Sequence, residues 1–274
     1  MMVEALVYFF VPALVGVLIG IASGLLGIGG GTVMVPIFRL AFGMSATMST
    51  ATSLFAIIPT SISGAISHVK GKTCIPALGI AAGLGGACLS PVGVWLAQLS
   101  PDWLVMLAAA LIIGYSAINM FKKAFKLRPA GQPAAGVDAA ASTADDSSLS
   151  RKQLLQGAAI GLVAGLASGY VGVGGGFIMV PLMLSIIGIP MRKASGTSLI
   201  AVMILAIPGV IEQGIIGNIN YLAGIAIVIG TIPGAVIGAR LVTKVPERTL
   251  RLLFGCFLIV AAVMLVLNEV GIFG

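Results

Sequence analysis

The sequence predicts an all-α polytopic membrane protein built from two inverted homologous repeats. Three observations support this prediction: 59% of the 274 residues are hydrophobic while only 8% are charged, apolar runs recur along the chain, and one glycine-rich block occurs twice. Soluble domains carry about 25% charged residues. A chain this poor in charge cannot cover a soluble surface, so its long apolar runs are expected to face lipid.

A helix that crosses the hydrocarbon core needs about 20 mostly apolar residues. Runs of this length cover residues 5–26, 47–68, 75–98, 102–121, 154–173, 195–216, 221–243 and 249–267. The first run follows Glu4 without a Lys or Arg, whereas a cleavable signal peptide begins with a positive region. We therefore expect residues 3–22 to stay in the protein as a first helix.

Two shorter apolar pieces, residues 32–44 and 177–190, follow the glycine blocks. Each is too short for an untilted crossing of the hydrocarbon core. They are predicted to be half-helices or re-entrant segments, with full crossing left open. The expected total is eight long transmembrane helices plus two short segments.

The two halves of the chain share one register. Gly29 and Gly174 lie 145 positions apart. The same separation relates Thr52-Ser53-Leu54 to Thr197-Ser198-Leu199, Gly64 to Gly209, Gly79 to Gly224, Gly93 to Gly238 and Pro101 to Pro246. This register predicts a duplicated module, with a first transmembrane repeat over residues 1–128 and a second over residues 151–274. Residues 129–150 are small, polar and acidic, and this composition predicts a flexible linker.

The basic residues predict how the repeats are oriented. Those that flank the linker are Lys122, Lys123, Lys126, Arg128, Arg151 and Lys152, and the positive-inside rule places them in the cytoplasm. If each half makes an odd number of passes, with the short piece counted as one, Arg39 alone among the 15 Lys and Arg residues lies outside. Four passes per half would instead place Arg192, Lys193, Arg240, Lys244, Arg248 and Arg251 outside. The charges thus favour inverted repeats with both termini outside.

The glycine blocks, within residues 22–36 and 167–181, are the strongest functional signal. Each glycine costs a helix about 1 kcal/mol relative to alanine, so four within five residues predict a break. A break inside a bilayer is tolerated where it faces protein or a water-filled cavity. Matched breaks in two halves point to a transporter's substrate site, and amides at a helix start bind anions.

The substrate site is therefore predicted from the blocks and from hydroxyls near them. The predicted binding residues are Gly27, Gly29, Gly30, Gly31, Thr32, Thr52, Ser53, Gly172, Gly174, Gly175, Gly176, Thr197 and Ser198, with the hydroxyls of Ser23 and Ser168 beside the breaks. The alternative is that the glycines only let helices pack closely and that the hydroxyls bond to their own helices.

Three ionisable residues, Arg39, His68 and Glu212, are candidates for ion coupling or anion attraction, because such groups are functional suspects in membranes. All lie near predicted helix ends, where reaching toward the interface is the simpler explanation. A serine enzyme would need a base beside Ser23 or Ser168. The single histidine, His68, lies instead near a predicted cytoplasmic helix end. No G-x-G-x-x-G, Walker or H-E-x-x-H motif occurs. The sequence therefore predicts no catalytic residue, metal or cofactor. No basic stripe interleaved with aromatic residues occurs, so we expect no binding to nucleic acid.

The two blocks, Gly-Leu-Leu-Gly-Ile-Gly-Gly-Gly-Thr-Val-Met-Val-Pro and Gly-Tyr-Val-Gly-Val-Gly-Gly-Gly-Phe-Ile-Met-Val-Pro, resemble those of the TauE/SafE family. The segments Ala-Thr-Ser-Leu (51–54) and Gly-Thr-Ser-Leu (196–199) and the basic central loop extend the resemblance. It implies a secondary transporter of the prokaryotic inner membrane for small sulfur-containing anions, such as sulfite, sulfonates or sulfoacetate. A proton or sodium is the expected coupling ion. An anion channel, a non-sulfur organic anion and a homo-oligomer stay open.

Overall fold

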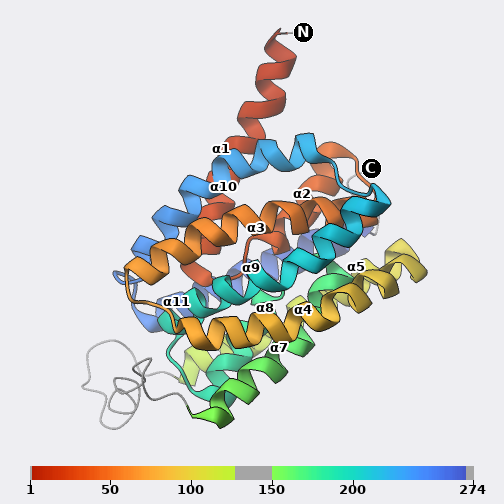
Figure 1. Ribbon diagram of the computed structural model, residues 1–274. Coiled ribbons are helices and arrows are strands. Elements are labelled where there is room, and N and C mark those ends of the chain that lie inside the picture. The colour runs from red at the N-terminus through yellow and green to blue at the C-terminus, as the bar shows by residue number, and fades with distance from the viewer. Residues whose placement is uncertain (1, 127–149, 270–274) are drawn as a thin grey trace.

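The computed structural model describes residues 2–126 and 150–269, with side chains described for residues 12–125 and 150–267. Within these ranges the chain is helical and contains no strand (Figure 1). The predicted flexible linker, residues 129–150, lies outside the described residues except for Ser150. Ser150 begins the second half, where its side chain and that of Gln153 form a capping box at the start of a helix.

The helices follow the two halves of the sequence. The first half contains α1 (Met2–Leu26), α2 (Gly31–Phe42), α3 (Ala46–Lys70), α4 (Pro76–Leu99) and α5 (Asp102–Lys126). The second contains α7 (Arg151–Val171), α8 (Gly176–Leu182), the π-helical turn η2 (Met183–Ile187), α9 (Met191–Ile216), α10 (Tyr221–Leu241) and α11 (Glu247–Glu269). Each predicted long segment overlaps one of these helices.

Seven of the described helices, α3, α4, α5, α7, α9, α10 and α11, are long and apolar enough to cross a membrane. Eight long transmembrane helices were expected. The eighth, α1, has described side chains only over Pro12–Leu26, which is shorter than a full crossing. The structure therefore supports a multi-pass membrane protein with seven candidate spans.

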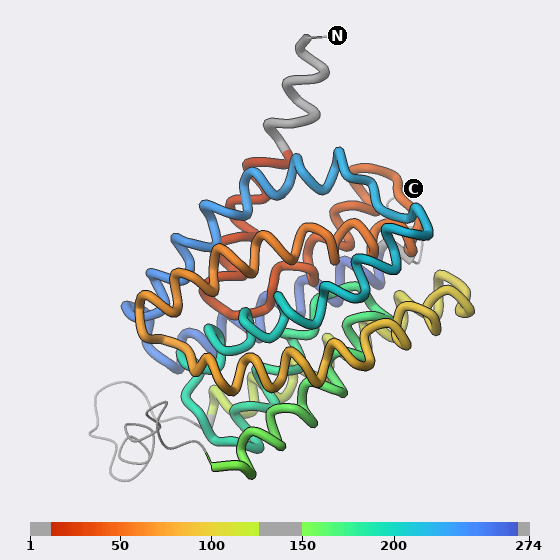
Figure 2. The backbone as a smooth tube through the Cα atoms, in the orientation of Figure 1, coloured from red at the N-terminus to blue at the C-terminus, as the bar shows by residue number. Residues whose placement is uncertain are grey.

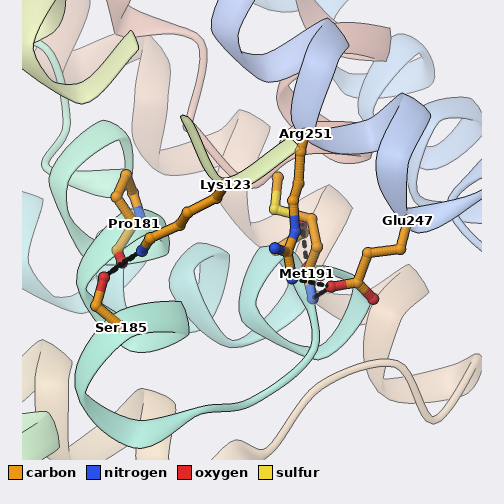
Figure 3. Close-up of polar contacts among 7 residues, drawn as sticks. Lys123, Pro181, Ser185, Met191, Glu247 and Arg251 are labelled. Carbon is orange, nitrogen blue, oxygen red and sulfur yellow. Dashed lines mark hydrogen bonds and ion pairs between the residues drawn. The ribbon is translucent and has the colours of Figure 1, made fainter. Parts of the chain in front are cut away.

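The short segments are shorter than an untilted crossing. α2 and the combined segment of α8 and η2, residues 176–187, each extend about 18 Å at 1.5 Å per residue, against about 30 Å of hydrocarbon. Each begins among buried residues and ends at a glycine with positive φ, Gly43 or Gly188. The second segment departs from α-helical geometry at η2, where Lys123 of α5 donates to the carbonyl of Pro181, 2.9 Å away, and to the hydroxyl of Ser185 (Figure 3).

The helices pack in pairs that recur at the repeat spacing. α10, α3, α9 and α4 lie side by side in a row, with α1 against α10 and α7 against α4 (Figure 2). A shift of 145 residues exchanges α3 with α9, α4 with α10 and α1 with α7, so it maps this set of contacts onto itself. The pair formed by α5 and α11 also exchanges.

Glycine lets the two outer pairs approach closely. The glycines of α1 that face α10 are Gly16, Gly20 and Gly24, and those of α7 that face α4 are Gly161, Gly165 and Gly169. A Cβ on any of them would collide with backbone atoms of the facing helix. Small residues at such spacing drive helix association in membranes. These six glycines are therefore packing positions.

Two carboxylates fix equivalent helix starts. Asp102, at the start of α5, accepts a hydrogen bond from the amide of Ala46 at 3.2 Å. Its counterpart Glu247, at the start of α11, accepts one from the amide of Met191 at 3.1 Å and also pairs with Arg251 (Figure 3). Each carboxylate satisfies a free amide at the positive end of α3 or α9. The N-termini of α3 and α5 thus lie together, as do those of α9 and α11.

We expect Gly161→Leu to disrupt the contact between α7 and α4. The added side chain would meet the backbone of Ala82, and overpacking of this kind costs about 1–3 kcal/mol or more. Thermal unfolding in detergent, read by size-exclusion chromatography, should show a lower midpoint or loss of folded protein. Gly114→Leu in α5 is the control, because open space surrounds that position. Equal stability of the two variants would contradict this account of the packing.

Candidate functional site

The helices are interrupted at the two glycine blocks. α1 ends at Leu26 and α2 begins at Gly31, while α7 ends at Val171 and α8 begins at Gly176. Every residue over 23–32 and over 171–177 is buried. Gly30 and Gly175, which precede the two short helices, have φ values of 87° and 66°. A side chain at either position would strain the backbone, so both breaks depend on glycine.

The two breaks lie against one another in the middle of the fold. A Cβ on Gly31 would stand 2.5 Å from the carbonyl oxygen of Val173, and one on Gly176 would stand 2.9 Å from that of Ile28. The side chain of Ile57, from the centre of α3, packs against both Gly31 and Gly174. The equivalent breaks of the two halves are therefore in direct contact between α3 and α9.

Two of the predicted binding hydroxyls hold the breaks in place. Ser53 donates to the carbonyl of Gly172 at 2.8 Å, and Ser198 donates to that of Gly27 at 2.7 Å. These bonds cross between the repeats, so each serine supports the break of the other half. A helix end leaves carbonyls without partners, and these hydroxyls satisfy one at each break.

The neighbouring threonines also have partners in the opposite half. Thr52 accepts from the amide of Asn220 at 3.0 Å, and Thr197 accepts from that of Ile75 at 2.9 Å. The four hydroxyls therefore bond across the interface of the two halves, and Ser198 also donates to the carbonyl of Ser195 in its own helix. Direct contact of the four with a substrate stays a prediction.

A different set of hydroxyls near the breaks has no partner. The side-chain oxygens of Ser23, Thr32, Ser61 and Ser168 are buried and make no hydrogen bond within the described residues. Ser23 lies beside Gly30, Ser168 beside Gly175, and the Ser61 hydroxyl is 3.5 Å from the position of a Cβ on Gly29. Leaving a buried hydroxyl unpaired costs about 1–3 kcal/mol. Such a cluster indicates a place where a polar ligand or water binds.

Ser61 was missed by sequence reasoning. Its signal is a polar run, Thr60 to Ser63, in the middle of an apolar helix that already carries Thr52 and Ser53. Its counterpart in the second repeat is Ala206, so the repeat comparison drew no attention to it. The second break therefore has fewer hydroxyls than the first.

Backbone amides add donors at the first break. The N–H groups of Gly31 and Thr32 begin α2 and make no hydrogen bond within the described residues, whereas Val33 and Met34 donate to the carbonyl of Gly30. The helix dipole places about half a positive charge at this end. No charged residue occurs over residues 12–38 or 153–191. The site thus offers neutral donors and a positive helix end.

The three ionisable candidates lie in different surroundings. Arg39 is half-buried in the last turn of α2, remote in sequence from the start of that helix. Glu212 is half-buried in α9, and one of its carboxylate oxygens has no partner among the described residues. His68 is fully buried, so it does not reach toward the interface as the simpler explanation held. Its Nε2 lies 2.7 Å from the carbonyl oxygen of Gly24, one turn before the first break.

Among the described residues, no three His, Cys, Asp or Glu side chains cluster as ligands of a metal ion would. Among the described residues, Cys74, Cys88 and Cys256 form no disulfide. What the breaks offer is therefore hydrogen-bond donors in a buried, uncharged setting. Groups of this kind hold a small anion, because they donate hydrogen bonds to it without introducing a fixed opposite charge.

Comparison with known proteins places the whole chain in one family. The family described as "Sulfite exporter TauE/SafE" matches residues 12–265. The chain is 27% identical to the "Probable membrane transporter protein YunE" of Bacillus subtilis (strain 168), over 97% of this chain and 99% of the relative. It is 29% identical to a "Probable membrane transporter protein" of Haemophilus influenzae, over 93% of this chain and 97% of the relative. No solved structure matches the chain.

The glycine blocks, the seven apolar spans and this match over nearly the full length agree. The chain belongs to the sulfite exporter TauE/SafE family and is a membrane transporter.

Proposed function

We propose that the protein is a secondary transporter that moves a small sulfur-containing anion by alternating access. The anion, of the sulfite, sulfonate or sulfoacetate class, is held where the two glycine breaks meet. The observation that carries the proposal is the pair of apposed, buried breaks with unpartnered hydroxyls beside both of them. The choice of a sulfur-containing anion rests on the family to which the chain belongs and not on the geometry of the site.

Neutral donors suit a cargo that must be released. Amides at a helix start and hydroxyls form charge-assisted hydrogen bonds to an oxyanion, each contributing about 1.5–3 kcal/mol. A buried Arg would add a strong fixed attraction that opposes release. The donor set of the first break includes the amides of Gly31 and Thr32 and the hydroxyls of Ser23, Thr32 and Ser61. The second break contributes Ser168 and the amide of Phe177.

The symmetry of the contacts supports alternating access between two inverted halves. α3 and α9 run in opposite directions, because the end of α3 at His68 packs on the start of α9 at Gly196. α1 with α10 and α7 with α4 form equivalent contacts at the two sides. Inverted repeats of this type can exchange conformations and open the same central site to either face of the membrane.

The charges support an orientation. The ends of α3, α5 and α10 lie on the left in Figure 1, where α7 also begins. Every Lys and Arg of the described residues except Arg39 lies in a segment that begins or ends at this end of the bundle. We assign it to the cytoplasm of a prokaryotic inner membrane, with both termini on the outer side.

The direct test is a thermal-shift screen of the purified protein with sulfite, sulfate, thiosulfate, sulfoacetate, taurine and simple carboxylates. A ligand that binds only the folded state stabilises it by about 2.7 kcal/mol at 100 times its Kd. We expect a sulfur oxyanion or sulfonate to raise the unfolding midpoint more than the carboxylates do. Stabilisation by carboxylates alone would favour a non-sulfur organic anion. In vesicles, flux that does not saturate would favour an anion channel.

The donor assignment is tested by Ser23→Ala and Ser168→Ala. Each removes a hydroxyl that has no protein partner, so stability of the free protein should be unchanged or slightly higher. Loss of one hydrogen bond to an anion should weaken binding by about ten- to a hundredfold. The measurement is a titration of each variant with the anion found in the screen, with binding read from the shift in the thermal unfolding midpoint.

Ser63→Ala is the matched control for both variants, because Ser63 donates to the carbonyl of Thr60 in its own helix. Its affinity for the anion should equal that of the wild type. If Ser23→Ala and Ser168→Ala also bind with wild-type affinity, the two hydroxyls do not contact the anion and the breaks serve packing alone.

A further inference from the structure

His68 makes a hydrogen-bond network that joins the first break to one end of the bundle. Its Nε2 lies 2.7 Å from the carbonyl oxygen of Gly24, and its Nδ1 lies 2.7 Å from the hydroxyl of Thr73. The Thr73 hydroxyl is also 3.3 Å from the carbonyl oxygen of His68 itself. Gly24 is in the last turn of α1, directly before the glycines of the break.

The network satisfies both protonation states of the ring. A carbonyl only accepts, so Nε2 must carry a proton in either state. In the neutral ring, Nδ1 accepts from Thr73. In the imidazolium, Nδ1 donates to Thr73, and the hydroxyl turns its proton to the carbonyl of His68. A proton can therefore be gained or lost by rotation of one hydroxyl, without breaking the contact with Gly24.

The second repeat has no such group. The counterparts of His68 and Thr73, at the repeat spacing, are Gln213 and Asn218, and Asn218 donates to the Gln213 oxygen at 2.8 Å. The side-chain amides of Gln213 and Asn218 thus occupy the equivalent position and form a hydrogen bond, but neither amide titrates. The ability to bind a proton is thus confined to one of two otherwise equivalent positions.

The Thr73 side of the network leads to the end of the bundle. A cavity of about 430 Å³ there is lined by Lys72, Thr73, Pro190, Arg192, Lys193 and Glu247. Protons from the adjacent solution therefore need to reach only the Thr73 hydroxyl. On its other side, the ring contacts the carbonyl of Gly24, one turn before the break where we place the anion. His68 lies between the cavity and the proposed site.

The surrounding charges link proton binding to anion binding. α1 has no charged residue over 12–26. The charged groups that line the cavity beside Thr73 are Lys72, Arg192, Lys193 and Glu247, and Lys70 and Arg240 lie in the last turns of α3 and α10. The five cations oppose a positive ring, whereas Glu247 and the negative end of the α1 dipole favour it. An anion at the break adds negative charge close to Gly24. It therefore favours the imidazolium, and by reciprocity the imidazolium favours the anion.

We propose that His68 is the proton-binding residue of the transporter and that its proton travels with the anion in the same direction. The inference rests on the proposed transport function and names its coupling ion. It assigns Thr73 as the positioning residue that accepts or donates as the ring changes state. Glu212, the other candidate, is half-buried in α9 and makes no hydrogen bond to the break among the described residues. Its counterpart in the first repeat is Ser67.

The first measurement uses the single histidine of the chain. With ¹⁵N-histidine labelling and an affinity tag free of histidine, NMR of the wild-type protein in detergent reports His68 alone. We expect the neutral Nε2–H form at high pH and the doubly protonated ring at low pH. Saturating thiosulfate or sulfoacetate should move the midpoint to higher pH. A ring that stays neutral down to pH 5 with the anions present would overturn the proposal.

The second measurement is accumulation of labelled thiosulfate, sulfate and sulfoacetate in vesicles with the membrane potential held at zero. These anions do not titrate near neutral pH, whereas sulfite does. One proton per anion predicts up to tenfold accumulation per pH unit of gradient, since one unit equals about 1.4 kcal/mol. His68→Gln, which copies the side chain of the second repeat, should equilibrate the anion without accumulating it. Glu212→Gln is the matched control and should accumulate like the wild type.

The outcomes separate the two proposals. No entry of any of the three anions into wild-type vesicles, under any gradient, would contradict the transport proposal for these substrates and the coupling built on it. Wild-type entry that ignores the pH gradient would contradict only the role of His68. So would accumulation that survives in His68→Gln or disappears in Glu212→Gln. The wild-type NMR titration holds regardless of how the variants fold.

Discussion

An interrupted helix in an apolar core must find partners for its freed backbone groups, and the rest of this structure depends on how it does so. The hydroxyls of Ser53 and Ser198 each bond to a carbonyl of the opposite break. Thr52 and Thr197 likewise receive amides from the opposite half. Neither half completes its own break. The two repeats must therefore assemble before either interruption is stable in the membrane interior.

This mutual support explains why glycine is used so heavily. The breaks need positive φ at Gly30 and Gly175, and they approach so closely that Gly31 and Gly176 have no room for side chains. The outer contacts of α1 with α10 and of α7 with α4 also use glycines, which leave no side chain between the facing helices. A tightly packed, paired arrangement has few intermediate states, which suits a protein proposed to alternate between two conformations.

The two repeats differ at a few positions near the proposed sites, and these positions hold the polar and titratable groups. Thr32 and Ser61 correspond to Phe177 and Ala206 in the second repeat, so the first break has more hydroxyls. His68 and Thr73 correspond to Gln213 and Asn218, so a titratable ring occurs on one side alone. Duplicated scaffolds retain the positions that both halves need for packing, while single positions are free to take a function. The proposed anion and proton sites both lie at such positions.

Much of the architecture follows from local properties of the chain. Hydropathy, glycine clusters and the spacing of 145 residues predicted the helical class, the two breaks and the half-length of α2 and α8, because each depends on neighbouring residues. The eighth long span is not established by the described part of α1. Local sequence did not indicate which hydroxyls already have partners, that Ser61 joins the breaks, or that His68 binds Gly24. These features depend on contacts between residues 32 to 171 positions apart, from Ser61 with Gly29 to Ser198 with Gly27. Such pairings are set by how helices pack, and no pattern along the chain encodes them directly.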